Sequence, residues 1–507
     1  MSDASVYDAI RSDAQLVVVE APAGCGKTHQ GADYAKALSE SPDGQRTLIL
    51  THTHAACSVF AGRTKEAGSR VEIATIDSLI ASIAGAYHAG LGVPADTAAW
   101  VRQRRDGYGE LALRVAALLK RHPMIAKAAA RRYPVVLCDE HQDSSGDQHA
   151  IVMALAGQGS RVRIFADPMQ RIFPDKPVKG GLPRYDWKAL TGAAQAFERL
   201  DFPHRWSRGG CPDLGAWTFK ARETLQNNGR IDLTAGLPDS VELVFVENQA
   251  QARMDFRPAP GLRKSIDDFE KSQPSLLVLT RYNDTARAIR AMFFRRLPIW
   301  EGHTRYGLDR LVAAIQNNKG NAAAIAAAVV GFMDDVGKGF SPSAFGERLV
   351  REATEGCTKS TSGKPALIQE LARTLMTEPD HRGVAKMLRR LCDMKEQQAA
   401  FGAIEIDHQK EFWEAVRLGD YETADIGLAE ITHRRTYTRP NPPVRAISTI
   451  HKAKGLECES VILVPINAET FPDKEDARCL LYVALSRATH RLQLVLSRAN
   501  PSPLFVL

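Results

Sequence analysis

A short apolar run that leads into a glycine-bearing loop and a Lys-Thr pair constrains this chain more than any other feature. Leu16 to Val19 have the pattern of a buried strand, APAGCGKT follows, and a helix-compatible segment runs on to Leu38. Glycines in such a loop let backbone N–H groups converge on phosphate at a helix N-terminus, while the lysine adds a cation and the threonine a hydroxyl for Mg²⁺. The pattern predicts a phosphate-binding loop made of Ala21, Pro22, Ala23, Gly24, Cys25, Gly26, Lys27 and Thr28.

Two adjacent carboxylates follow a second apolar run, Val135 to Cys138. A buried strand that delivers Asp139 and Glu140 together is costly unless a metal ion or hydrogen-bond donors compensate their charges. We expect Asp139 to hold Mg²⁺, directly or through water, and Glu140 to take a proton from an attacking water. An acidic pair after a strand is often only the start of a loop, but its place downstream of a phosphate-binding loop favours nucleotide hydrolysis.

The succession of strand-like and helical segments predicts an α/β protein with two cores. Strands that alternate with helices favour parallel sheets with functional groups at their carboxyl edges. The expected strands are 16–19, 47–51, 71–75, 135–139 and 162–166 in the first core, and 241–246, 276–280, 444–448, 461–464 and 492–496 in the second.

Each core is interrupted by a helical insertion. The first insertion is rich in basic residues, and the Pro-rich segment 439–443 marks the return from the second, because successive prolines favour extended chain. The predicted boundaries are 1–79 and 134–199 for the first core, 80–133 for its insertion, 200–302 and 440–507 for the second core, and 303–439 for its insertion.

Composition sets limits on the class of protein. The 507 residues carry a formal net charge of +7, with 44% hydrophobic and 25% charged residues, which excludes a disordered or collagenous chain and allows a polyanionic partner. Eight scattered cysteines, with no CxxC pair, indicate reduced and mostly buried thiols. The N-terminus has no apolar signal segment, and the longest apolar stretch, 322–333, is shorter than the roughly 20 residues that cross a bilayer. We therefore expect a cytoplasmic protein without a membrane partner.

Motifs along nearly the whole chain resemble those of the superfamily 1A DNA helicases of the UvrD, Rep and PcrA type. The similar segments, in the order of that family, are APAGCGKT at 21–28, THTHAA at 51–56, TIDSL at 75–79, DEHQD at 139–143, ADPMQRIF at 166–173, LDFPHRW at 200–206, TIHKAKGLE at 449–457 and YVALSRA at 482–488. The resemblance implies two RecA-like parallel-sheet motor domains, 1A and 2A, with helical insertions 1B and 2B. It implies ATP and Mg²⁺ as cofactors.

The same resemblance implies roles for residues outside the two motifs already described. Gln170 matches a γ-phosphate sensor that also touches DNA, and Arg205 and Arg487 match two arginine fingers, which stabilise charge on a transferred phosphoryl group. Gly455 and Glu457 lie in the segment that reaches the nucleotide, with Glu457 at the sugar-contacting position. Both arginines would come from the second core, so the nucleotide is expected between the cores.

Contacts to single-stranded DNA are also implied. The expected contact residues are Thr51, His52, Thr75, Phe173, Thr449 and His451. Phe173 is the best candidate for stacking on a base, although a phenylalanine is also a common core residue. The two histidines have an equally plausible structural role.

Several positions depart from the family pattern. The upstream glutamine that reads adenine is missing from 5–10, His204 stands where an adenine-stacking tyrosine is usual, and His29 replaces an arginine. The choice among ATP, GTP and deoxynucleoside triphosphates is therefore open.

The resemblance implies a helicase that translocates on single-stranded DNA, 3′ to 5′. Both insertions are shorter than in the full-length helicases, and compact chains of this kind resemble the helicase-like subunit of the Gabija antiphage system, which works beside an OLD-family nuclease. The alternative is a nucleotide-gated subunit that senses single-stranded or end-containing DNA and regulates a partner nuclease, with little unwinding of its own.

Overall fold

The computed structural model describes residues 2–40, 45–102, 104, 106–246, 260–301, 306–340, 345–437 and 443–507. The chain divides into two compact units: unit 1 is Met1–Arg296 with Pro443–Leu507, and unit 2 is Leu297–Pro442. The predicted boundaries at 302/303 and 439/440, like most of the Pro-rich segment 439–443, lie outside the described residues. The division into four domains stays a prediction.

The first part of unit 1 contains a six-stranded parallel sheet in the order β3-β2-β4-β5-β1-β6. All five strands expected for the first core are present, and the edge strand β6 was not predicted. The strands are β1 Leu16–Glu20, β2 Thr47–Thr51, β3 Val71–Thr75, β4 Val135–Cys138, β5 Arg161–Ala166 and β6 Ala196–Arg199.

Alternate residues of these strands enter two different hydrophobic clusters, as the period of a strand requires. Val17, Ile49 and Leu137 pack with α1, α2 and α3 on one face. Leu48 and Ile164 pack with α4, α7 and α9 on the other. Both faces are covered, which is typical of a parallel sheet and explains why its strands are continuous apolar runs.

The helices predicted as the first insertion share the second of these clusters. Ile80 of α4 and Leu111 and Val115 of α7 are buried with the strand residues, so the hydrophobic core continues from the sheet into this helical region. The helices of this part are α1 Ser2–Arg11, α2 Lys27–Glu40, α3 His54–Arg63, α4 Ile76–Ala86, α5 His88–Leu91, α6 Thr97–Arg102, α7 Gly107–Arg121, α8 Pro123–Arg132, α9 Gly146–Ala156 and α10 Trp187–Ala193, with 3₁₀ turns η1 Lys65–Arg70, η2 His141–Asp143 and η3 Pro168–Gln170.

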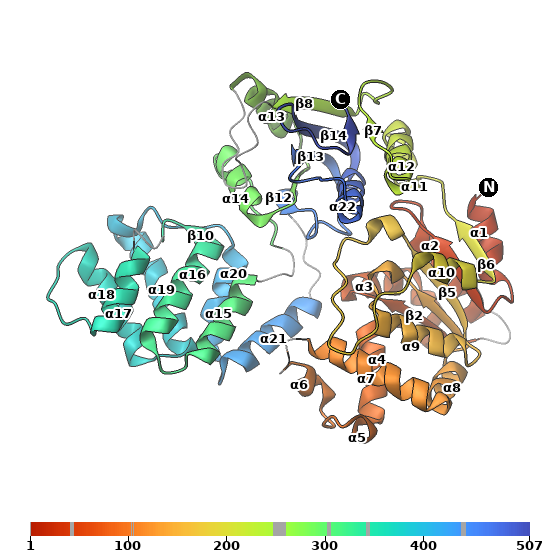
Figure 1. The fold of residues 1–507 in the computed structure, drawn as a ribbon, viewed down its shortest axis with the longest axis horizontal. Coiled ribbons are helices and arrows are strands. Elements are labelled where there is room, and N and C mark those ends of the chain that lie inside the picture. The colour runs from red at the N-terminus through yellow and green to blue at the C-terminus, as the bar shows by residue number, and fades with distance from the viewer. Residues whose placement is uncertain are drawn as a thin grey trace. The chain divides into compact units, whose positions relative to one another are not determined.

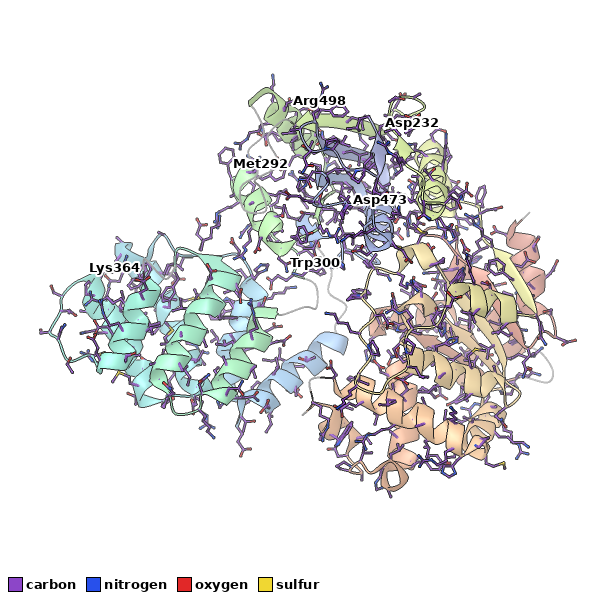
Figure 2. All side chains as sticks on the ribbon, viewed as in Figure 1. Asp232, Met292, Trp300, Lys364, Asp473 and Arg498 are labelled. Atoms are coloured by element: carbon purple, nitrogen blue, oxygen red, sulfur yellow. The ribbon has the colours of Figure 1, made fainter. Side chains whose placement is uncertain are left out.

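The second part of unit 1 is a five-stranded parallel sheet in the order β12-β9-β13-β14-β8. It joins strands from both sides of unit 2 in the sequence, and blue β14 lies beside green β8 (Figure 1). The guanidinium of Arg498, labelled in Figure 2, lies 4.8 Å from the centroid of the Phe245 ring of β8. The strands are β8 Val241–Val246, β9 Leu276–Thr280, β12 Arg445–Thr449, β13 Cys458–Ile466 and β14 Ala488–Ser497.

All five strands expected for the second core are therefore confirmed, with ends that differ by a few residues. The accompanying elements are α11 His204–Gly209, α12 Pro212–Gln226, α13 Pro260–Ser272, α14 Asn283–Met292 and α22 Glu475–Leu485, with a short parallel pair formed by β7 Ile231–Asp232 and β15 Phe505–Val506.

Unit 2 is helical, with a core of Leu, Val, Ile, Met and Phe side chains. Glu301, His408 and Glu411 bring one ligand-type atom each within 4.8 Å of one another in its interior. Both oxygens of Glu301 accept from the N–H groups of Lys410 and Glu411 at the start of α20, and Glu411 accepts from Leu308 N, so helix capping accounts for these carboxylates. The elements are α15 Tyr306–Asn317, α16 Ala322–Val336, α17 Glu347–Glu355, α18 Lys364–Thr377, α19 His381–Gln397, α20 Gln409–Arg417, α21 Ala424–Tyr437, η5 Ala399–Phe401, η6 Leu418–Asp420 and the antiparallel pair β10 Gly337–Lys338 and β11 Glu405–Ile406.

Among the helices that the structure describes, none combines the length and the apolar character needed to cross a bilayer. All eight cysteines are free, as expected. Only Cys25, Cys138 and Cys479 are buried, and the other five are partly exposed, so the prediction of mostly buried thiols was wrong.

Candidate active site

The predicted phosphate-binding loop connects β1 to α2 at the carboxyl edge of the first sheet. Gly24 and Gly26 have positive φ angles of 78° and 82°, which side chains with a Cβ rarely adopt. Ala21 N donates to Ala166 O of β5 at 2.8 Å, and Cys25 is fully buried beneath the loop, where burial raises the pKa of its thiol. The hydrogen bond to β5 and the buried Cys25 side chain therefore anchor the loop to the first sheet region. The N–H groups of the loop lie at the N-terminus of α2.

Residues of α11 lie directly against this loop. Arg205 N donates to Gly24 O at 3.1 Å, and a Cβ added to Gly24 would come within 2.8 Å of the Trp206 ring. Trp206 is itself fully buried and donates from Nε1 to Ala488 O at 2.8 Å. Gly24 thus satisfies two demands at once, a positive φ and the close approach of an aromatic ring.

The predicted metal ligand and base follow β4. Asp139 is 5% exposed, and Asp139 N donates to Leu50 O of β2 at 2.9 Å. Glu140 has a left-handed φ of 54°, an uncommon conformation for a residue with a side chain, and its carboxylate ion-pairs with the Lys27 ammonium. The structure brings the lysine of the loop and the predicted base into direct contact.

The charges of this region are mutually dependent. Burial lowers the pKa of the Lys27 ammonium, with Asp139 acting in the opposite direction. Burial raises the pKa of the Asp139 carboxyl, while Lys27 opposes that change. Lys27 and Asp139 therefore each offset part of the effect that burial has on the pKa of the other.

The oxygen donors predicted for Mg²⁺ fit that ion. A carboxylate and a hydroxyl are the hard ligands that Mg²⁺ prefers, and it commonly takes only one or two protein groups together with phosphate oxygens. Asp139 is a buried carboxylate in need of positive charge, and Thr28 stands in the first turn of α2. These two residues would hold the ion.

A buried ionic network lies behind the predicted γ-phosphate sensor. Gln170 Nε2 donates to Asp167 Oδ2 at 2.9 Å, and Arg222 Nη2 donates to Asp167 Oδ1 and to Glu20 Oε1, both at 2.7 Å. The side chains of Arg222 and Asp167 are completely buried. Sequence reasoning missed Arg222, because a single arginine in an amphipathic helix carries no local signal of such a partner.

The two predicted arginine fingers make different contacts. Arg205 donates to Ser486 O at 2.8 Å and pairs with Glu457 at 2.5 Å. Arg487 is 2% exposed and donates to Val483 O, Leu456 O and the Ser486 hydroxyl at 2.9, 3.0 and 2.7 Å. The pKa of the Arg487 guanidinium is lowered to about 10, mainly because the group is buried and secondly because the positive charge of Arg205 is nearby. Arg487 is not an ordinary surface arginine.

Residues of the second sheet region reach into the first. Lys454 Nζ lies 2.7 Å from both oxygens of Asp143 and donates to Gln170 O at 2.8 Å. Ala23 N of the loop donates to Tyr482 Oη at 2.8 Å. Gly455, with a φ of 81°, allows the turn that follows Lys454. Within unit 1 the last two sequence motifs therefore contact the first, the fourth and the fifth.

Phe173 is exposed enough to meet a base. Its side chain is 44% exposed, which decides against the reading of a core residue. The His451 ring lies 6.2 Å and the Lys454 ammonium 5.2 Å from its centroid. Phe173 lines a hollow of about 510 Å³ together with Arg171, Asp175, Arg184, Tyr185, Asp186, Glu475, Asp476 and Cys479.

The threonines predicted to touch DNA have structural contacts. Thr51 donates to Thr53 O at 3.1 Å, and the Thr75 hydroxyl accepts from Ser78 N as the N-cap of α4. Thr449 is 6% exposed at the end of β12. His52 is hydrogen-bonded to Ser144 at 3.0 Å. A role of these four residues in DNA binding stays a prediction.

The positions that depart from the family pattern are also placed. His204 Nε2 lies 2.6 Å from Asp3 Oδ2 of α1, and a Cβ added to Gly26 would come within 3.4 Å of the His204 ring. His29 is exposed on α2. The ring of His204 therefore lies beside the loop, held by a carboxylate from the N-terminal helix.

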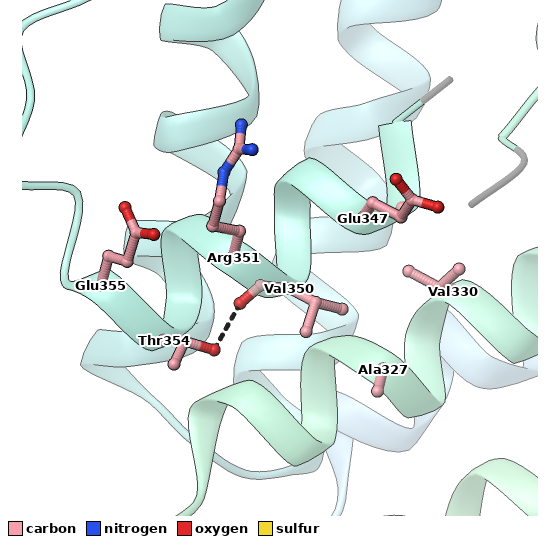
Figure 3. A pocket seen from close by; sticks show the side chains of 8 residues that line it. Ala327, Val330, Glu347, Val350, Arg351, Thr354 and Glu355 are labelled. Carbon is pink, nitrogen blue, oxygen red and sulfur yellow. Dashed lines mark hydrogen bonds between the residues drawn. The ribbon is translucent and has the colours of Figure 1, made fainter. Parts of the chain in front are cut away.

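A second hollow of about 510 Å³ lies in unit 2, between α16 and α17 (Figure 3). Ala327, Val330 and Val350 give it an apolar wall, and Thr354 donates to Val350 O at 2.8 Å within α17. None of the predicted site residues lines it. The chemistry expected from the sequence is confined to unit 1.

Comparisons with known families match two stretches of the chain. Residues 97–174 match the UvrD/REP helicase N-terminal domain, which includes the DEHQD segment and Gln170. Residues 446–495 match the UvrD-like helicase C-terminal domain, which includes Lys454, Tyr482 and Arg487. No curated protein matches the chain. Together with the two parallel sheets, the matches support a UvrD/Rep-like superfamily 1 helicase, an ATP-driven enzyme that acts on DNA.

Proposed function

We propose that this protein is a DNA-stimulated ATPase that translocates on single-stranded DNA in the 3′ to 5′ direction. One observation carries the proposal: Lys454 joins Asp143 of the DEHQD segment to the backbone of Gln170, while Tyr482 binds the phosphate loop. Residues that bear on hydrolysis and residues predicted to lie on the strand thus share one contact network. Such a network suits a motor, in which hydrolysis and movement must be coupled.

Each residue at the phosphate end has a proposed task. The Gly24 and Gly26 region presents N–H groups to the phosphates, and Lys27 leaves Glu140 to neutralise them. Thr28 and Asp139 would hold Mg²⁺, which when bound would neutralise charge on the phosphate oxygens. Release of Glu140 from Lys27 frees its carboxylate to accept a proton from the attacking water.

The arginines are proposed to act in the same cycle. Arg205 gives up Glu457 and turns toward the phosphates, which leaves Glu457 free for the sugar hydroxyls. Arg487 exchanges its backbone acceptors for phosphate oxygens. Because both arginines are tied to the segment around Ser486, their movement would carry the second sheet region with them.

Base selection is proposed to be relaxed, so that GTP and deoxynucleoside triphosphates are used beside ATP. The residue beside the loop is His204, bound to Asp3, in place of a larger stacking ring. We also place the protein in the cytoplasm, where a motor of this kind meets DNA, and we carry the four-domain division 1A, 1B, 2A and 2B as part of the proposal.

A second candidate function is a nucleotide-gated subunit that senses single-stranded or end-containing DNA and regulates a nuclease of the OLD family, in an antiphage role like that of the Gabija system. The continuous core between the first sheet and α4–α8 favours it, because that helical region is small and firmly joined to the motor. A nuclease-regulating chain would hydrolyse nucleotide on DNA without displacing a strand.

Phosphate release measured with and without single-stranded DNA tests the main proposal. We expect strong stimulation in the wild-type protein and none in Lys27→Ala. Lys36→Ala, on the same helix but paired at the surface with Glu66, is the matched control and should behave as wild type. Stimulation that persists in Lys27→Ala, or its absence from the wild type, would contradict the proposal.

Strand displacement separates the two candidates. Duplexes with a 3′ or a 5′ single-stranded tail should be unwound only from the 3′ tail if the chain is a 3′ to 5′ helicase. Stimulated hydrolysis without displacement from either tail would favour the regulatory subunit.

A further inference from the structure

Three histidines and a serine form a continuous hydrogen-bonded row beside the predicted base. His52 Nε2 lies 3.0 Å from Ser144 Oγ, which lies 3.1 Å from His141 Nδ1. His141 Nε2 in turn lies 3.0 Å from His149 Nδ1. We call these four residues the histidine row.

The two ends of the row belong to different parts of the site. His52 follows β2 in the segment proposed to hold the DNA strand, and His141 is the residue directly after Glu140. Ser144 joins them, although it lies outside every motif that the sequence pointed to. The proposed catalytic cycle makes no use of this connection.

The aromatic ring of Tyr185 holds the far end in place. Its centroid lies 4.2 Å from that of His149 and 5.2 Å from that of His141, and Tyr185 Oη donates to His141 O at 2.9 Å. Asp143 N donates to Glu140 O at 3.0 Å, which closes the turn that carries the base. The ring and the backbone of His141 are thus both fixed, one by the row and the other by Tyr185.

The hydrogen bond between His141 Nε2 and His149 Nδ1 joins two ring nitrogens, so one of the two nitrogens must accept and the row contains at least one neutral imidazole. Burial lowers the pKa of His52 and of His141, and it lowers that of His149 to about 4. Around His52, Asp143 acts in the raising direction, whereas Lys454 and Arg184 act in the lowering direction. A neutral imidazole carries one N–H proton and one acceptor nitrogen, and the hydrogen bonds at its two nitrogens decide which nitrogen holds the proton.

If the three rings are neutral, the protons of the row can be placed in only two ways that give each of its three hydrogen bonds one donor and one acceptor. In the first, His52 donates to Ser144, Ser144 to His141, and His141 to His149. In the second, every bond is reversed. Passing from the first to the second adds one proton at His52 Nδ1 and releases one from His149 Nε2, so the net charge of the row is unchanged.

We propose that Ser144 and His141 are positioning residues through which DNA bound at His52 adjusts the turn that carries Glu140. A phosphate oxygen that accepts from His52 Nδ1 makes Nε2 an acceptor and selects the second arrangement. His141 then donates to Ser144 and accepts from His149, so the bonds that hold its ring next to the turn of Glu140 are reversed. This inference rests on the proposed function, since it assigns to the row the stimulation of hydrolysis by DNA.

The substitution Ser144→Ala tests the proposal, because it breaks the row at its centre without touching the nucleotide or the strand. We expect hydrolysis at saturating single-stranded DNA to fall roughly tenfold, as the loss of about one buried hydrogen bond in the stimulated state implies. Hydrolysis without DNA, the KM for ATP and the DNA concentration for half-maximal stimulation should each stay within about twofold of wild type. Ser144→Thr keeps the hydroxyl and should restore stimulation.

Ser160→Ala is the matched control. Ser160 is fully buried in unit 1 and its hydroxyl donates to Tyr133 O at 2.9 Å, outside the row. If Ser144 had only a structural role, Ser144→Ala would lower the rates of hydrolysis with and without DNA by the same factor, as any damaging substitution of a buried serine does. That result, or full stimulation in Ser144→Ala, would overturn the proposal.

His52→Gln provides a second measurement if Ser144→Ala folds poorly. Substitutions at both ends of one row should not add, so the double variant should be stimulated about as weakly as Ser144→Ala alone. Independent, multiplicative losses would overturn the proposal. A wild-type protein that no DNA stimulates would instead refute the proposed function, so the two failures are distinguishable.

Discussion

The two units differ in how they accommodate the charged groups that they bury. In unit 1, Glu20, Asp167 and Arg222 are buried together behind the site, and Asp139 is buried beside Lys27. In unit 2 the core consists of aliphatic and aromatic side chains, and the buried Glu301 and Glu411 accept backbone N–H groups. Because a buried ion pair adds little net stability compared with apolar packing, the charges of unit 1 indicate chemistry, whereas the core of unit 2 indicates support.

Glu140→Gln is the most direct test of whether unit 1 carries the chemistry of hydrolysis. Removing a general base lowers turnover by about 10²- to 10⁴-fold, and nucleotide and DNA binding should remain. Phosphate release and filter binding measure the two properties. Glu66→Gln, an exposed partner of Lys36, should leave both unchanged. Normal turnover in Glu140→Gln would remove the assigned role.

Arg222→Met tests whether the buried charges of unit 1 depend on one another. The substitution leaves Asp167 buried without its cation and leaves Glu20 with the more distant Arg199 at 3.7 Å, which should cost about 3–5 kcal/mol of unfolding free energy. Denaturant unfolding of the full chain measures it. Arg434→Met, which breaks an exposed pair with Glu430 in unit 2, should cost less than about 1 kcal/mol. Equal costs would show that burial of the network is energetically unimportant.

Leu388→Ala tests the supporting role of unit 2. Leu388 is fully buried on α19, so its truncation should cost about 2–5 kcal/mol, while phosphate release without DNA stays near wild type below the unfolding temperature. Calorimetry and phosphate release measure the two effects. The volume-conserving Leu388→Met should cost less than about 1.5 kcal/mol. Loss of hydrolysis in Leu388→Ala at a temperature where the chain is folded would contradict a purely supporting role of unit 2.

Phe173→Ala should weaken binding of single-stranded DNA by about 1–3 kcal/mol, because it removes one stacking ring. Fluorescence anisotropy with a labelled oligonucleotide measures the affinity. Phe294→Ala is the matched control, since that ring is also exposed, at 67%, but lies on a different part of unit 1. Equal affinities for the wild type and Phe173→Ala would place the strand elsewhere.

The smallest effect concerns pH. The pKa of His149 is lowered from 6.5 to about 4 in the folded chain, so the unfolded chain binds more protons between these values. Stability contributed by His149 is therefore complete above pH 6.5 and is lost as the pH falls toward 4. Thermal unfolding at pH 7 and pH 5 should show a smaller decrease for His149→Gln than for the wild type. The same decrease in both proteins would contradict a neutral His149.

The sequence predicted the sheets well because apolar runs bounded by polar or small residues are a local signal. It missed β6, where Ala196–Arg199 is short, lies at the sheet edge and carries two charged residues. For the site, the phosphate loop and the DEHQD segment were recognisable because their chemistry requires fixed spacing. Arg222 and Ser144 were not, because Glu20 and Asp167, the partners of Arg222, and His52, one partner of Ser144, lie far away in the chain and only the fold brings them together.

The buried thiol of Cys25 has a consequence for how the protein can be handled and observed. A thiol reacts with alkylating agents and oxidants through its thiolate, and burial beneath the phosphate loop suppresses that form as well as access to it. The folded loop is thus protected from oxidative damage at its centre. Any labelling of Cys25 by a small electrophile under native conditions would report the moments at which the loop opens.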